Sequence, residues 1–229
     1  MAHGAKESPY VMLNLTSLTI TETDNTRSTF SDAFSLLTAP ALDSLELRLN
    51  TRKYVSNPVA SIEAFLARSR CTLGILVLDG VSIVDEEVIA LLKQLPSLIQ
   101  LTIMDSLNSQ ATLPVTKKLV ESLHGHRHSA LHPTFIPIIP KLQSITLGVH
   151  SPGFDAELFV NMIASRWFPD SDEYSALNAG VSCMRSVELF LSKSCNDADY
   201  IGLNQFEKVG MCTVVKKRLA YKMRNYNTC

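Results

Sequence analysis

The chain has 229 residues, 46% of them hydrophobic and 19% charged, which is long enough to bury one substantial core or a continuous repeat array. Lys and Arg total 21 and Asp and Glu total 22, so no charge imbalance indicates a nucleic acid or an anionic membrane as a partner. The sequence holds no run of about 18 apolar residues and no secretory signal after Met1, and we therefore expect a protein of the cytoplasm or nucleus without a membrane span.

A six-residue pattern, apolar-x-x-apolar-x-apolar, recurs along the chain, and each copy ends in the alternation typical of a β-strand. The copies start 27, 31, 25, 44 and 42 residues apart, at Leu15, Leu42, Leu73, Leu98, Leu142 and Met184. The copy from Met184 fits the pattern least well. A fixed strand motif with spacers of variable length predicts an internal repeat.

Helices are predicted between the strand copies, because apolar residues return there every three or four positions. The strongest begin at Asn57-Pro58, where Asn57 is a candidate N-cap, at the acidic run Asp85-Glu86-Glu87, and at Asp155. Acidic residues stabilise a helix start, whose backbone N–H groups are unpaired. Weaker helices are expected over Ser28–Leu37 and Pro114–Leu123. A short helix and a closing strand, with Gly210 as the turn between them, are expected over Leu203–Val214.

Alternating strands and helices with one repeated strand motif predict parallel strands joined by helical crossovers. Two α/β architectures have such crossovers, an open leucine-rich-repeat-like solenoid and a doubly wound domain, in which both strand faces are buried. Here the residue between the last two apolar positions is polar in most copies, at Thr19, Glu46, Thr102, Thr146 and Glu188. A strand face that is exposed to solvent favours the solenoid. The predicted fold is a short curved array over residues 13–215, between a flexible segment 1–12 and a basic tail 216–229.

The alternation along the strands separates a predicted core from a predicted binding surface. A hydrophobic ladder is expected from Leu45, Leu76, Leu101 and Ile145. The candidate partner-binding residues lie beside these positions, on the opposite strand face: Thr19, Glu46, Arg48, Ile75, Val77, Asp79, Gln100, Thr102, Met104, Thr146, Glu188 and Phe190. An apolar centre with a polar surround is the common anatomy of a protein-binding patch, and a protein partner is therefore expected.

Four histidines suggest the one candidate metal site. His124, His126, His128 and His132 lie in an irregular insertion expected over about residues 124–140. Imidazoles at this spacing are compatible with zinc or copper, and the alternative function they suggest is a metal-dependent hydrolase. Because Gly125 and nearby prolines oppose a helix there, a solvated loop is the preferred interpretation, with no metal and no cofactor.

The other reactive residues carry no catalytic pattern. The consecutive carboxylates from Asp85 to Glu87 point in different directions on a helix, which favours a helix start over paired acid–base groups. The five cysteines are odd in number and form no CxxC pair, which favours reduced thiols over a disulfide framework. No glycine-rich phosphate loop is present. The chain is therefore not expected to be an enzyme.

Three phrases of the sequence resemble a known family. Leu95-Pro-Ser-Leu-Ile-Gln-Leu-Thr-Ile103, Phe65-Leu-Ala-Arg-Ser-Arg-Cys-Thr-Leu73 and Met162-Ile-Ala-Ser-Arg-Trp167 look like the C-terminal repeat region of fungal F-box proteins of the mushroom type. The resemblance covers roughly Leu13 to Val215. It implies leucine-rich repeats that select a protein for ubiquitination by a cullin ligase.

The F-box itself is not recognisable in this sequence, because the first repeat strand already begins at Leu15. Binding to a Skp-type adaptor is therefore not expected, and a truncated or decayed copy without independent function is the alternative to a binding module. The first strand lacks a capping element, which repeat arrays need for solubility. We therefore expect a protein that is either marginally stable or self-associating through the N-terminal edge, which carries Leu15, Leu18 and Ile20.

Overall fold

The computed structural model describes residues 9–23, 30–50, 58–105, 113–125, 137–150, 154–168, 180–192 and 197–217. Within these ranges the chain forms a seven-stranded sheet and, at its N-terminal end, a two-stranded sheet of β1 (Tyr10–Val11) and β3 (Leu37–Thr38). Every strand pair in both sheets is parallel. The expected α/β class with parallel strands is confirmed.

The strands of the large sheet lie side by side in the order in which they occur along the chain. They are β2 (Ser17–Thr23), β4 (Ser44–Asn50), β5 (Ile75–Asp79), β6 (Gln100–Met104), β7 (Ser144–Val149), β8 (Ser186–Leu191) and β9 (Cys212–Lys217). Because no later strand is inserted between earlier ones, each unit contacts mainly the unit before it and the unit after it.

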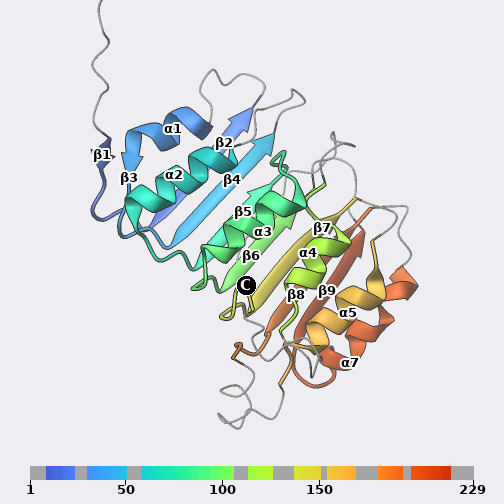
Figure 1. The fold of residues 1–229 in the computed structure, drawn as a ribbon. Coiled ribbons are helices and arrows are strands. Elements are labelled where there is room, and N and C mark those ends of the chain that lie inside the picture. The colour runs from blue at the N-terminus through green and yellow to red at the C-terminus, as the bar shows by residue number, and fades with distance from the viewer. Residues whose placement is uncertain are drawn as a thin grey trace, which may run out of the picture.

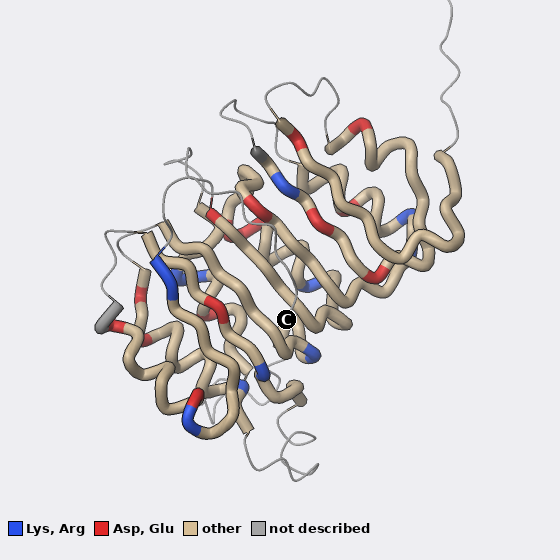
Figure 2. Tube along the Cα trace, turned by 180° about the vertical axis from the view of Figure 1, so that it is seen from behind, with Lys and Arg blue, Asp and Glu red and all other residues tan. Residues whose placement is uncertain are grey.

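The described helices all lie on the same side of the sheet (Figure 1), and the view from behind shows the strands uncovered (Figure 2). The crossover helices are α1 (Phe30–Leu36), α2 (Val59–Ser69), α3 (Asp85–Lys93), α4 (Lys117–Ser122) and α5 (Ala156–Ala164). The 3-10 helix η1 (Asp197–Leu203) and α7 (Asn204–Glu207) precede β9. None of the helices in the described part of the chain is long and apolar enough to cross a membrane.

Polar side chains fix the starts of three crossover helices. The Asp155 carboxylate accepts a hydrogen bond from Leu158 N at 2.9 Å, and the Thr116 hydroxyl accepts one from Leu119 N at 3.3 Å. Glu87 accepts one from Val84 N at 3.3 Å. These bonds satisfy backbone N–H groups that have no partner within the helix. The helix starts predicted at Asp85 and Asp155 are confirmed, whereas α2 begins one residue later than predicted, after Pro58 as its N-cap.

The core lies between the sheet and the helices. Leu45, Leu76, Leu101 and Ile145 are direct neighbours on consecutive strands, and each is at most 1% exposed. The predicted ladder is therefore confirmed. Val187 extends it onto β8, and a second ladder of Leu47, Leu78, Ile103, Leu147 and Leu189 runs beside it.

The ends of the array differ from the sequence expectation at one place and agree at another. Tyr10 and Val11 form a strand inside the segment 1–12, which was predicted to be flexible. The predicted helix, turn and closing strand at the C-terminal end are confirmed, with Gly210 at φ +101° before β9. Most of the predicted insertion, and residues 218–229 of the predicted tail, lie outside the described residues.

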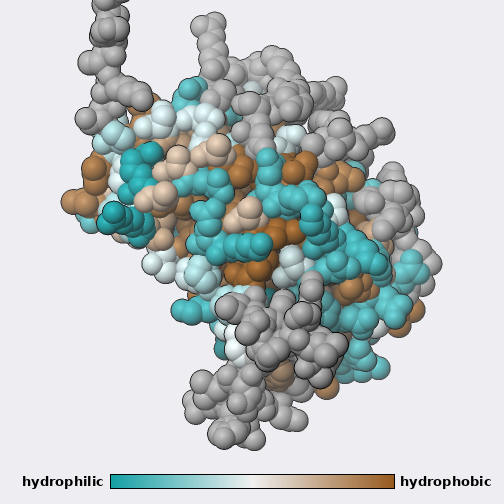
Figure 3. All heavy atoms as spheres, viewed as in Figure 1, coloured by the Kyte–Doolittle hydropathy of each residue, from teal (hydrophilic) through white to brown (hydrophobic). Residues whose placement is uncertain are grey.

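Large apolar side chains are exposed at the N-terminal end of the array. Val11, Leu13 and Tyr10 are 59%, 67% and 62% exposed, and Met12 and Leu36 are also exposed. We call these five residues the N-terminal apolar cluster. Figure 3 shows hydrophobic atoms at the left end of the molecule, where Figure 1 places β1. A shallow hollow lined by residues 11–15 lies within this region.

Candidate binding surface on the open sheet face

The side of the sheet opposite the helices, which we call the open face, consists of three rows of side chains that cross the strands. The middle row contains Thr19, Glu46, Val77, Thr102, Thr146, Glu188 and Val214. The row toward the strand starts contains Ser17, Ser44, Ile75, Gln100, Ser144, Ser186 and Cys212. The row toward the strand ends contains Thr21, Arg48, Asp79, Met104, Gly148, Phe190 and Lys216.

The structure brings all twelve predicted binding residues onto this one face, in the predicted register. Thr19 and Gln100 are exposed, and eight others are partly exposed. The alternation along each strand decided this placement, since a shift of one residue would have turned the whole set into the core.

Met104 and Phe190 correct the prediction that all twelve are accessible to a partner. They are only 4% and 7% exposed although they belong to the open face. Gly148 lies between them in the same row. A Cβ atom on Gly148 would come within 2.7 Å of Cε and 2.8 Å of Sδ of Met104. The thioether of Met104 therefore lies over Gly148, and the expected apolar centre is reduced to Ile75 and Val77.

Arg48 forms ion pairs with two carboxylates toward one end of the open face. Its guanidinium contacts Glu46 on the same strand at 2.8 Å and Asp79 on the next strand at 3.7 Å. All three side chains keep 27–28% of their surface exposed. One cation thus bridges two carboxylates, which leaves a net negative charge beside the apolar residue Val77. Figure 2 shows that most residues along the strands of the large sheet are uncharged.

Sequence reasoning missed the contribution of the last strand. Val214 and Lys216 belong to the middle row and the strand-end row. The six-residue pattern does not extend to β9, but the alternation around Val214 in the predicted closing strand was a usable signal.

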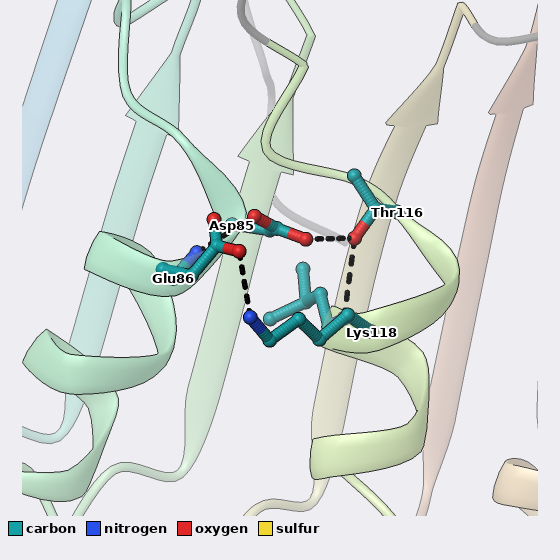
Figure 4. Close-up of polar contacts among 5 residues, drawn as sticks. Asp85, Glu86, Thr116 and Lys118 are labelled. Carbon is teal, nitrogen blue, oxygen red and sulfur yellow. Dashed lines mark hydrogen bonds and ion pairs between the residues drawn. The ribbon is translucent and has the colours of Figure 1, made fainter.

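The acidic run at the start of α3 is engaged in structural contacts on the helix side of the sheet (Figure 4). Asp85 accepts a hydrogen bond from the Thr116 hydroxyl at 2.6 Å, and Glu86 pairs with Lys118 at 2.6 Å. The pKa of Glu86 is lowered to about 2 by a side-chain hydrogen bond with Asp85 and then by the bond from Lys118. These contacts join the first turns of α3 and α4, which agrees with a helix-start role.

The histidine hypothesis concerns residues that the structure describes only in part. His124 is described, whereas His126, His128 and His132 lie outside the described residues. Among the residues that are described, no group of three or more His, Cys, Asp and Glu side chains is arranged to hold a metal ion.

The segment Ser165-Arg166-Trp167 fastens the end of α5 to its neighbours. Arg166 is fully buried and donates from Nε to Leu123 O at 2.6 Å and from Nη1 to Ile139 O at 3.1 Å. Burial lowers the pKa of Arg166 to about 10. Trp167 packs edge-on against Phe206 with ring centres 6.4 Å apart.

Comparison with known proteins gives no match to a family model, to a curated protein or to a solved structure.

Proposed function

We propose that the chain is a leucine-rich-repeat-like solenoid that binds another protein through its open face and catalyses no reaction. The single observation that carries the proposal is the one-sided architecture. Seven parallel strands follow one another in chain order with their helices on one side. A doubly wound sheet has helices on both faces, whereas a solenoid leaves one strand face free for a partner.

A hydrogen bond that recurs in two distant units supports the repeat. The buried hydroxyl of Ser69, at the end of α2, accepts a bond from Ala39 N at 3.0 Å. The buried hydroxyl of Ser165, after α5, accepts one from Gly125 N at 2.9 Å. In both units an arginine follows the serine and a residue of the preceding unit donates the bond. An internal repeat is expected to have the same hydrogen bond at equivalent positions of different units.

The chemistry of the open face favours a protein segment with a small apolar side chain and a neighbouring cation. Val77 and Ile75 offer partly exposed apolar surface, and the carboxylates of Glu46 and Asp79 lie beside them, both in contact with Arg48. Serine and threonine hydroxyls surround this centre and supply hydrogen-bond donors and acceptors. Polar groups that surround an apolar centre exclude water from the partner side chain that binds there, and this side chain contributes most to the affinity.

The resemblance to F-box repeat regions gives this proposal a biological setting. In that setting the open face would select a protein for ubiquitination, in the cytoplasm or nucleus. The ligase role needs an F-box, and the described chain from β2 to β9 is already occupied by strands and their crossover helices. We therefore do not expect the chain as given to bind a Skp-type adaptor.

Two lysine substitutions test the open face against the helix side. Val77→Lys places a cation at the centre of the middle row, and Ala90→Lys places one on the exposed side of α3. A protein captured by the wild-type chain is identified by mass spectrometry and then purified for affinity measurement. We expect Val77→Lys to weaken its binding on the order of tenfold or more and Ala90→Lys to leave it unchanged.

Other results of the same experiment would contradict the proposal. Equal binding by both variants would place the partner elsewhere on the molecule. Failure to capture any protein in a stoichiometric complex would favour the decayed copy. Stoichiometric zinc in protein purified without a histidine tag would favour the metal-dependent hydrolase, which needs three convergent ligands.

A further inference from the structure

Among the residues that the structure describes, no strand pairs with the outer edge of β2. Asp43 N and Ser44 N donate to Thr16 O at 2.9 and 3.0 Å, so the backbone of Thr16 faces β4. Successive residues of a strand direct their N–H and C=O groups to opposite sides. Leu18 and Ile20 therefore face β4 as well, whereas the backbone groups of Ser17, Thr19 and Thr21 point away from the sheet.

The opposite edge of the sheet is protected by charge. On β9, Cys212 N donates to Arg185 O at 2.9 Å, which makes Thr213, Val215 and Lys217 the residues whose backbone faces outward. Lys216 and Lys217 end this strand and are exposed. Lysines on an edge strand hinder pairing with another strand. The sequence of β2, Ser-Leu-Thr-Ile-Thr-Glu-Thr, has no lysine or arginine.

We propose that β2 pairs with β2 of a second copy of this chain, antiparallel and about a two-fold axis through Ile20. Ile20 is the middle residue of the seven in β2, so this register overlaps the whole strand with itself. Thr19 then lies opposite Thr21 of the second copy, and both are residues whose N–H and C=O groups face outward. They exchange two hydrogen bonds in each half of the dimer.

The charges and faces of the strand also agree with this register. Glu22, the one charged residue in β2, lies opposite Leu18 of the second copy and not opposite its own equivalent. Like charges directly opposite each other would destabilise the pair. Side chains on the helix side of one copy meet helix-side side chains of the other: Ile20 lies opposite Ile20, and Leu18 lies opposite Glu22. The two sheets therefore join with their helices on the same side.

The exposed apolar surface at this end of the molecule favours a contact that covers it. The N-terminal apolar cluster leads directly into β2, and Leu15, Leu18 and Ile20 are only partly buried. Exposed apolar surface of this kind marks an interaction site more often than surface scattered singly over a molecule. The dimer edge is distinct from the middle of the open face, so this inference does not rest on the proposed function.

A pair of proline substitutions tests the contact in the full chain. Thr19→Pro removes an outward N–H from β2, and Thr213→Pro removes the equivalent outward N–H from β9. Proline is tolerated where the lost N–H faces away from the sheet. By light scattering and sedimentation we expect a dimer for the wild type and for Thr213→Pro. For Thr19→Pro we expect dimerisation weakened on the order of tenfold or more.

A thiol placed on the two-fold axis tests the register and does not depend on the proline variant. Ile20→Cys puts two thiols opposite each other in a pair whose Cα atoms are about 4.5 Å apart, within disulfide range. Val215 occupies the equivalent row on β9, and Val215→Cys is the control. Mild oxidation should link two copies through the introduced thiols of Ile20→Cys, identified by peptide mass, and not through those of Val215→Cys.

Three results would overturn the proposal. A wild-type chain that stays monomeric at about 100 μM, well above typical weak dimer concentrations, has no such interface. Assemblies that grow beyond a dimer with concentration would indicate a head-to-tail contact between β2 and β9. Equal disulfide yields from the two cysteine variants would show that β2 is not at a two-fold axis.

Discussion

The two faces of the sheet place neighbouring residues of one strand in very different surroundings. On β6, Leu101 is 1% exposed against the helices, and Thr102, the next residue, is partly exposed on the open face. The same contrast separates Leu45 from Glu46 and Leu76 from Val77. The helix side must exclude water along the whole sheet, because its buried residues belong to one continuous hydrophobic core. The open face carries no such requirement, and packing therefore constrains its composition less.

Exceptions on each face show where packing between units overrides the alternation. On the open face, Met104 and Phe190 are buried around Gly148. On the helix side, Arg166 and Glu22 are charged groups among apolar neighbours. A buried polar group is tolerated only where hydrogen bonds replace those it made with water. Substitutions at regular positions, and then at these exceptions, should therefore change the free energy of unfolding by different amounts on the two faces.

The largest expected effect comes from a regular core position. Leu101→Ala should lower the free energy of unfolding by about 2–5 kcal/mol, because it removes buried methyl groups and leaves a cavity between Leu76 and Ile145. Thr102→Ala, one residue further on, should change it by less than about 0.5 kcal/mol. Reversible urea unfolding followed by circular dichroism measures both.

Equal losses of unfolding free energy in the two variants would contradict the proposed difference between the faces. A loss below about 1 kcal/mol for Leu101→Ala would mean that the ladder is not tightly packed. A large loss for Thr102→Ala would mean that the open face contributes to the core. The slope of free energy against urea should be the same in both variants, since neither changes the surface exposed on unfolding.

The second effect concerns the buried guanidinium of Arg166. Arg166→Met keeps much of the side-chain volume but leaves Leu123 O and Ile139 O without their donors. Each unsatisfied buried acceptor costs about 1–3 kcal/mol. Removal of a buried charge offsets part of this cost, and Nη2 of Arg166 has no hydrogen-bond partner among the described residues. We expect a net loss of about 2 kcal/mol in the same urea experiment.

Arg166→Lys provides the control for this prediction. Its ammonium is a point charge and cannot reproduce two separate, directed N–H donors. If the hydrogen bonds to the two carbonyl oxygens matter, the lysine variant should be at least as unstable as Arg166→Met. Stability equal to that of the wild type in either variant would show that the arginine does not fasten α5 to its neighbours.

Local pattern was sufficient to predict the six strands from β2 to β8 in the large sheet, their register and their two faces. The apolar-x-x-apolar-x-apolar copies placed Leu45, Leu76, Leu101 and Ile145 in one ladder, because alternation in a strand follows from backbone geometry alone. Helix starts at Asp85 and Asp155 were also predictable, since their side chains act on backbone groups within one turn.

Features that depend on contacts between units were not predictable in this way. The burial of Met104 requires a glycine at position 148 on the neighbouring strand. The burial of Arg166 requires carbonyl oxygens of Leu123 and Ile139, each in a different segment from the arginine. In the sequence Arg166 is one basic residue at the end of a helix, and such residues are ordinarily exposed.

The smallest effect is a dependence of stability on pH that arises at Glu22, the charged residue on the helix side of β2. Glu22 is 5% exposed and accepts a hydrogen bond from Phe30 N at the start of α1. Its pKa is raised above 4.5, chiefly because burial removes water from the carboxylate; the Phe30 bond opposes the rise and nearby Asp32 adds to it. A carboxyl group whose pKa is higher in the folded protein contributes stability below its unfolded pKa. That stability is lost as the pH rises through the folded value.

Glu22→Gln keeps an oxygen acceptor but cannot ionise. The midpoint of thermal unfolding of this variant, relative to wild type, should therefore increase between pH 4 and pH 8, the direction set by this raised pKa. Glu22→Ala removes the acceptor and should be less stable than Glu22→Gln by about 1 kcal/mol over the same range, because Phe30 N loses its bond. A difference between Glu22→Gln and wild type that stays constant with pH would show that the carboxylate of Glu22 remains solvated, and that this edge of the helix side is as wet as the open face.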